Sequence, residues 1–187
     1  MRQLIIVLLL LLYNSISIAA NYSLEIVQPQ PNLTTVNRFY KAYPGLVYNV
    51  RPAVIGGAYP FTYTLTAYPS GMSINSSTGI ISWQNPTTTG SPHAVTVSVR
   101  DSEGTVATVS WTITVDSSGF YFVDAVDGKT VANGGTGTFA NPWKTIEDWY
   151  LTKYNTAYQG GFLYFRSGTY TVPALEDGTR LAFNQLS

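Results

Sequence analysis

Oxygen ligands for a cation are the first chemistry that this sequence offers. Asp101 and Glu103 fall in a turn between two expected strands, and Asp116 follows the second of these strands. Asp124 and Asp127 come a few residues later. A hard cation such as Ca²⁺ takes about six to eight oxygen ligands, and the short linker after the second strand supplies only one carboxylate. We therefore favour solvated turn residues, with a calcium site built from these five residues as the alternative.

Aromatic side chains that could stack on sugar rings form the second group. They gather in and beside an expected short helix: Trp143, Trp149, Tyr150 and Tyr154. Rings of this size bury a large apolar area, so on such a helix they more often close a core. Core packing is the interpretation we favour, and stacking on carbohydrate is the alternative.

Paired carboxylates for glycoside cleavage form the third group, Glu147 with Asp148 and Glu176 with Asp177. A glycosidase needs two carboxyl groups that face one bond across a set separation. Adjacent residues point in different directions, so these pairs are typical of solvated faces or helix caps. We predict no catalytic residue in this chain.

Two further motifs are incomplete. His93 is the only histidine and the chain has no cysteine, so neither a triad nor a metal site is indicated, and we expect a solvated loop histidine. The Gly134–Gly137 run lacks the Gly-Lys-Ser/Thr ending of a phosphate loop.

The composition favours an all-β protein outside the cytoplasm. Ten basic residues balance ten acidic residues among 187, so no basic face points to nucleic acid. Charged residues make up 11% of the chain, whereas Tyr alone supplies 14 residues. Sparse charge with abundant Tyr, Thr and Val is typical of pleated, half-buried surfaces. Without cysteine there is also no disulfide framework.

Residues 1–20 have the pattern of a secretory signal peptide. Arg2 precedes an apolar run from Leu4 to Tyr13, and small residues lead to Ala19 and Ala20, where we expect cleavage. That run is about half of the roughly twenty residues that a membrane-spanning helix needs. We therefore expect no transmembrane span after cleavage, and a secreted or cell-surface protein.

Short strands separated by turn residues follow. After a lead-in strand segment at 21–45, residues 46–116 predict a β-sandwich, with Phe61, Tyr63 and Leu65 on one face of a strand. The clearest strands are 94–100 and 106–115, which form a hairpin. We expect the alternating valines of the first to pack against Trp83 and Phe61.

Four motifs in this region carry a resemblance: PFTYTL, PSGMSINSSTGIISW, VTVSVRDSEG and a last strand ending TITV. Their order resembles the putative Ig domains of bacterial surface proteins, a family similar to cadherin-like and dystroglycan-type domains. The resemblance implies a sandwich of about seven strands that serves as a spacer or adhesive module. In cadherin-like domains, acidic residues near such strand ends can bind calcium, although the acidic linker of that site is missing here.

Residues 117–187 change in character. We expect strands at 120–126, 162–166 and 167–172, with a Gly-rich loop and a short helix to about residue 154 between the first two. That helix begins either after Asn141 or after Thr145 with Asp148 at capping-box spacing.

The motifs FYFVDAVDG, GTGTFANPWKTIED and GGFLYFRSGTYTV resemble the N-terminal cap and first coil or coils of right-handed parallel β-helix proteins of the pectin-lyase-like type. In such enzymes the catalytic acidic, Lys and Arg residues come from later coils. A solenoid needs roughly three or more stacked repeats, and this chain has room for about one or two. We therefore expect the sequence to be the N-terminal piece of a longer protein.

Together these patterns predict an exported Ig-like spacer or adhesion module that presents a β-helix for contact with polysaccharide or another cell-surface ligand. One alternative is the N-terminal part of a polysaccharide lyase or hydrolase whose catalytic coils lie downstream. A second alternative is a cadherin-like structural linker stiffened by calcium, the one cofactor that the sequence suggests.

Overall fold

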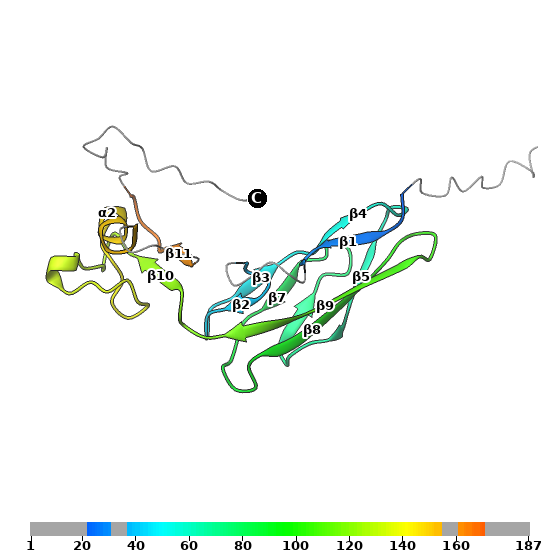
Figure 1. Ribbon diagram of the computed structural model, residues 1–187, viewed down its shortest axis with the longest axis horizontal. Coiled ribbons are helices and arrows are strands. Elements are labelled where there is room, and N and C mark those ends of the chain that lie inside the picture. Colours follow the sequence, from blue (N-terminus) through cyan, green and yellow to red (C-terminus); the bar gives the residue numbers. More distant parts are fainter. Residues whose placement is uncertain (1–21, 31–36, 155–160, 171–187) are drawn as a thin grey trace, which may run out of the picture. The chain divides into compact units, whose positions relative to one another are not determined.

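The computed structural model describes residues 22–30, 37–154 and 161–170, and strands dominate it (Figure 1). The chain divides into two compact units, which we treat separately. Of the described residues, the sandwich unit comprises 22–30, 47–85 and 93–113. The C-terminal unit comprises 37–46, 86–92, 114–154 and 161–170. The all-β prediction is confirmed.

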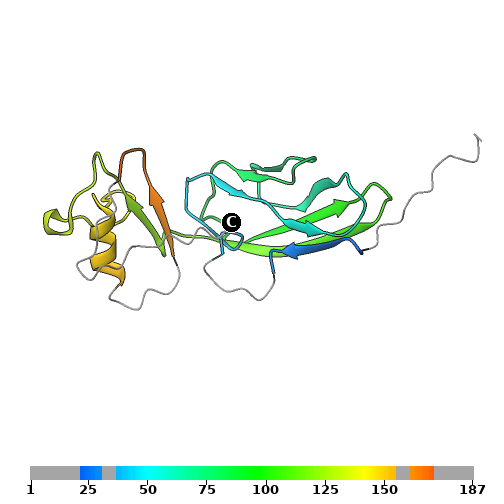
Figure 2. The same cartoon turned by 90° about the horizontal axis from the view of Figure 1, so that it is seen from above.

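The sandwich unit contains two main sheets, seen as two layers in Figure 2. In one, β5 (Thr62–Ala67) pairs antiparallel with β8 (His93–Arg100), which pairs antiparallel with β9 (Val106–Val115). In the other, β7 (Ile81–Trp83) lies between β3 (Tyr48–Val50) and β6 (Met72–Ile74). A separate antiparallel pair joins β1 (Glu25–Gln28) to β4 (Ala53–Ile55).

Alternation along the strands builds the core of this unit. Val95, Val97 and Val99 on β8 are fully buried, whereas the residues between them are only half-buried. Burying a valine side chain stabilises the folded state by about 1.5–3 kcal/mol. Trp83 on β7 is also buried, and its indole N–H donates to the Ser70 carbonyl oxygen at 3.1 Å. The large ring can therefore fill the core without leaving its polar atom unpaired.

In the C-terminal unit, β10 (Phe120–Val123) and β11 (Phe162–Phe165) pair in parallel. β2 (Lys41–Ala42) pairs in parallel with the last two residues of β9. A 3₁₀ turn, η1 (Val131–Asn133), and the helix α2 (Ile146–Trp149) lie between β10 and β11 in the sequence, and α2 continues into η2 (Tyr150–Tyr154).

The helix begins at the second of the two predicted caps. The Thr145 hydroxyl accepts the Asp148 N–H at 3.1 Å, and the Asp148 carboxylate accepts the Thr145 N–H at 3.1 Å. This reciprocal capping box satisfies two N–H groups that the first turn of the helix would leave unpaired. The Asn141 alternative is wrong.

Three local predictions fail. Residues 167–170 form no strand, and residues 171 and 172 lie outside the described part of the chain. Phe61 precedes β5 and is only half-buried, so it lines a surface pocket instead of the core around Trp83. His93 is the first residue of β8 and packs edge-on against Trp83 with ring centroids 4.9 Å apart, so it is not a solvated loop residue.

Candidate functional site

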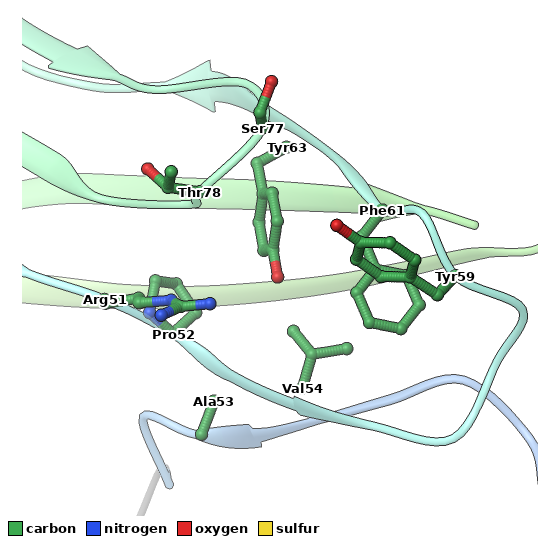
Figure 3. Close-up of a pocket in the computed structure, with 9 residues that line it drawn as sticks. All are labelled: Arg51, Pro52, Ala53, Val54, Tyr59, Phe61, Tyr63, Ser77 and Thr78. Atoms are coloured by element: carbon green, nitrogen blue, oxygen red, sulfur yellow. The ribbon is translucent and has the colours of Figure 1, made fainter. Parts of the chain in front are cut away.

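A pocket of about 570 Å³ opens in the sandwich unit (Figure 3). Ligand pockets in proteins usually measure about 300–1,000 Å³. Three segments line it: Arg51–Val54 leading into β4, the aromatic residues at 59, 61 and 63 leading into β5, and the turn after β6 at Ser77 and Thr78.

Three aromatic rings form one wall of the pocket. Tyr59 meets Phe61 edge-to-face with centroids 5.8 Å apart, and Phe61 meets Tyr63 in the same way at 6.5 Å. Tyr59 lies in a bend of the chain and Tyr63 in β5, with Phe61 between them just before the strand begins. Tyr59 is 81% exposed and Tyr63 only 4%, so this wall runs from solvent into the core.

The Tyr63 hydroxyl points into the pocket (Figure 3). It makes no hydrogen bond to any residue that the structure describes, although the rest of the side chain is buried. The pocket therefore contains a hydroxyl that can donate or accept one hydrogen bond.

Arg51 supplies the charge of the pocket. Its side chain is exposed and its guanidinium reaches into the pocket (Figure 3). Arg51 has no carboxylate partner in residues 22–30, 37–154 and 161–170, unlike Lys41, which pairs with Asp116, and Arg166, which pairs with Asp124. No acidic side chain lines the pocket either.

Hydrogen bonds fix the turn after β6, which contributes Ser77 and Thr78 to the pocket. The Asn75 side-chain oxygen accepts the N–H groups of Ser77 and Thr78 at 3.0 and 2.9 Å. Gly79 then adopts a φ of +73°, and a Cβ there would lie 2.7 Å from the Tyr63 ring. The Tyr63 N–H also donates to the carbonyl of residue 76 at 2.9 Å. The turn therefore packs closely against the Tyr63 ring.

A second polar group, the Asp101 carboxylate, organises the turn between β8 and β9. One of its oxygens accepts the N–H groups of Glu103 and Thr105 at 3.1 and 2.8 Å, and the other accepts the Ala58 N–H at 3.1 Å. Burial alone would raise the pKa of Asp101, but these backbone donors outweigh it and the pKa lies below its ordinary value. Both oxygens of the Asp101 carboxylate are therefore used to hold the backbone of this turn.

A family model described as "Putative Ig domain" matches residues 21–116. The chain belongs to this family. The Ig-like part of the predicted resemblance is thereby confirmed. The matched range contains every strand from β1 to β9, so the Putative Ig domain of this chain includes both the lead-in strands and the pocket.

A search of curated proteins finds no match to the chain. Among solved structures, a putative alpha-galactosidase from Bacteroides fragilis is 19% identical, with a TM-score of 0.37, over 49% of this chain and 17% of that one. A putative alpha-galactosidase/melibiase from the same organism is 15% identical, with a TM-score of 0.40, over 54% of this chain and 20% of that one. The aligned part is thus at most a fifth of either protein, and a likeness at this level carries no conclusion about this chain.

The five predicted calcium ligands are divided between the two units. In the sandwich unit, the Asp101 carboxylate accepts backbone N–H groups and Glu103 is exposed. In the C-terminal unit, Asp116 pairs with Lys41 at 3.3 Å, and exposed Asp127 gives only its backbone N–H to Asp124.

Asp124 itself is held by protein groups. Its carboxylate pairs with Arg166 at 3.2 Å and accepts the N–H groups of Val126 and Asp127. The Asp127 N–H is the largest influence on its pKa, which is lowered although burial acts in the opposite direction. The described residues contain no group of three or more His, Asp or Glu side chains that could hold a metal ion, so they do not fit a calcium cage.

Three of the four predicted stacking residues have side chains that the structure describes, and none of the three is fully exposed. Trp143 is fully buried and stacks on Tyr121 with centroids 5.7 Å apart, so its ring has no exposed face in this structure. Trp149 and Tyr150 are half-buried on the helix. The side chain of Tyr154 lies outside the described part of the structure.

Of the predicted carboxylate pairs, the structure describes Glu147 and Asp148, which differ in exposure and in role. Asp148 is buried, closes the capping box and accepts the Val131 N–H at 2.9 Å, whereas Glu147 is exposed. Glu176 and Asp177 lie outside the described residues.

The pocket itself was not predicted from the sequence. A signal was present, because the alternation of Phe61 and Tyr63 extends back to Tyr59 and beyond the expected strand. The positions of Arg51 and Thr78 carry no such signal, since strand pairing across β3, β7 and β6 brings their segments together.

Proposed function

We propose that this chain belongs to an exported modular protein, secreted or at the cell surface. The Putative Ig domain is its spacer or adhesion module, and it presents a β-helix for contact with carbohydrate or another surface ligand. Family membership supports the first part of this proposal. Export is supported by the pattern of residues 1–20, which lie outside the described residues.

The observation that carries the β-helix is the parallel pairing of β10 with β11. Four residues of each strand are in register, from Phe120 opposite Phe162 to Val123 opposite Phe165. Aligned rings lie over each other, with Phe120 and Phe162 4.9 Å apart and Phe122 and Tyr164 5.6 Å apart. Parallel strands with aligned side chains are the arrangement by which successive coils of a solenoid bury a continuous core.

The same pairing favours a second candidate, a polysaccharide lyase or hydrolase of the pectin-lyase-like type. Its catalytic coils would lie downstream of Ser187. The enzyme must bind and cleave a polysaccharide, whereas the adhesion module must bind carbohydrate or another surface ligand without cleaving it. In the described part of the chain, no helix is long and apolar enough to cross a membrane.

Co-sedimentation tests the proposal. The whole protein, isolated from its own host, is mixed with insoluble polysaccharides and with host cell envelopes, and both the pellet and the released sugar are measured. We expect the protein in the pellet without released sugar. Release of oligosaccharides would instead support the enzyme, and a protein that stays in the supernatant with every polysaccharide and envelope would refute both candidates.

A further inference from the structure

We propose that the pocket beside β5 is a binding site for an acidic saccharide, in which one ring bears a carboxylate as a uronic acid does. The inference rests on the proposed function, because it assigns the contact with carbohydrate to a particular site. That site lies in the Putative Ig domain, whereas the sequence pattern alone suggested sugar stacking in the C-terminal unit.

Charge is the first argument. The exposed guanidinium of Arg51 lines the pocket without a carboxylate partner in the described part of the chain. A guanidinium presents its N–H donors as a planar fork that matches the two oxygens of a carboxylate. A negatively charged group that enters the pocket meets this fork and no acidic side chain.

The aromatic wall is the second argument. Tyr59 is 81% exposed. Phe61 is half-buried, and its ring meets the Tyr59 ring nearly at right angles. A pyranose ring has faces of C–H groups, which gain by covering apolar surface of this kind. A ring that lies on Tyr59 or Phe61 shares the pocket with the Arg51 guanidinium, so one ligand can use both features.

The Tyr63 hydroxyl is a third argument, independent of both. Tyr63 is only 4% exposed, yet its hydroxyl points into the pocket and has no hydrogen-bond partner among the described residues. Ser77 and Thr78 also line the pocket, but their hydroxyl groups point away from the Tyr63 hydroxyl (Figure 3). Sugar hydroxyls both donate and accept, so a saccharide can satisfy the Tyr63 hydroxyl. An acidic peptide side chain could pair with Arg51, but its carboxylate brings no hydroxyl group to Tyr63.

Isothermal titration of the whole protein tests the site, with a short oligogalacturonate as the acidic ligand and the matching neutral galactose oligosaccharide as its comparison. We expect the acidic ligand to bind at least about tenfold more tightly, since hydrogen bonds to charged groups are the stronger class. Its affinity should also fall as salt rises, because the charge on Arg51 is exposed.

Two substitutions locate the contact. Arg51→Gln should lower affinity for the acidic ligand about tenfold, and Tyr63→Phe should lower it roughly threefold to tenfold by removing one hydroxyl. Arg100→Gln and Tyr68→Phe are matched controls at exposed residues outside the pocket, and they should leave affinity unchanged. Thermal unfolding of each variant confirms that it is folded.

The inference is overturned if the two ligands bind equally, if neither binds, or if Arg51→Gln behaves like Arg100→Gln. It is also overturned if poly-glutamate competes as well as the acidic sugar, since the pocket would then recognise an acidic peptide. If Arg51→Gln abolishes oligogalacturonate binding but the variant still co-sediments with polysaccharide, a second contact exists and the pocket assignment stands. If wild type co-sediments but never binds the oligosaccharide, this inference fails and the proposed function survives.

Discussion

Gly79 links the stability of the Putative Ig domain to the shape of its pocket. The residue has a φ of +73°, and a Cβ there would lie 2.7 Å from the Tyr63 ring. An L-residue in the left-handed region costs about 1–2 kcal/mol, and overpacking of a buried ring adds about 1–3 kcal/mol. We therefore expect Gly79→Ala to lower the free energy of unfolding by about 2–5 kcal/mol.

Gly71→Ala is the matched control. Gly71 also has a positive φ, +81°, but a Cβ there would approach only the Trp83 indole, at an ordinary 3.8 Å. Gly71→Ala should therefore lower the free energy of unfolding only by the cost of the left-handed backbone conformation, about 1–2 kcal/mol. Any stabilisation from a stiffer unfolded chain is common to both alanine variants and cancels in their difference. The expected difference of about 1–3 kcal/mol therefore reports the contact with Tyr63.

Urea unfolding of the whole chain, followed by tryptophan fluorescence, measures this difference, because Trp83 and Trp111 both lie in the sandwich unit. In a Tyr63→Ala background, Gly79→Ala should cost no more than Gly71→Ala does, since the clashing ring is gone. Equal costs for the two glycines in the wild-type background would show that Tyr63 is not packed against this turn, and the geometry of the pocket would be wrong.

Three further predictions concern the polar groups. The pKa of Asp101 is lowered from its ordinary 3.8. Its contribution to stability is therefore present above that value and is lost as the pH falls through the lower pKa of the folded state. The melting temperature should stay level from about pH 7 to 5 and drop below about pH 4, and this drop should be less steep in Asp101→Asn. Millimolar calcium should leave the melting temperature unchanged, because the carboxylates of Asp101, Asp116 and Asp124 already accept protein N–H groups or pair with Lys41 and Arg166. A rise in melting temperature that disappears in Asp101→Ala would instead support the hypothesis of a calcium-stiffened linker. Thr145→Ala should destabilise the C-terminal unit by about 1 kcal/mol, measured by urea unfolding, because it removes the hydroxyl that accepts the Asp148 N–H; an unchanged midpoint would mean that the capping box contributes nothing.

Local sequence patterns predicted much of the sandwich. The strand Val106–Val115 has both of its expected bounds, and the alternating valines 95, 97 and 99 are buried as expected. These features depend on the period of two along a strand, which can be read from neighbouring residues. The capping box also depends on a fixed short spacing, so Thr145 and Asp148 could be proposed as one of two alternatives.

The failures share a physical cause, because they depend on contacts between distant segments. His93 looked like a loop residue beside Pro92, but pairing with Ile113 extends β8 to include it. Phe61 looked like a core residue by alternation, but it lies just before β5 and is only half-buried. The pocket could not be predicted from either pattern, because Arg51 and Thr78 meet the aromatic wall only after three strands have paired.

Export is the premise on which the proposed function rests, and sequencing the mature N-terminus of the protein from fractionated host cells tests it most directly. We predict a processed chain that begins at Ala20 or Asn21 in the extracytoplasmic or surface fraction. An unprocessed chain that begins at Met1 and stays in the cytoplasm would contradict the proposal, because neither a surface adhesion module nor a secreted polysaccharide-binding protein could act there.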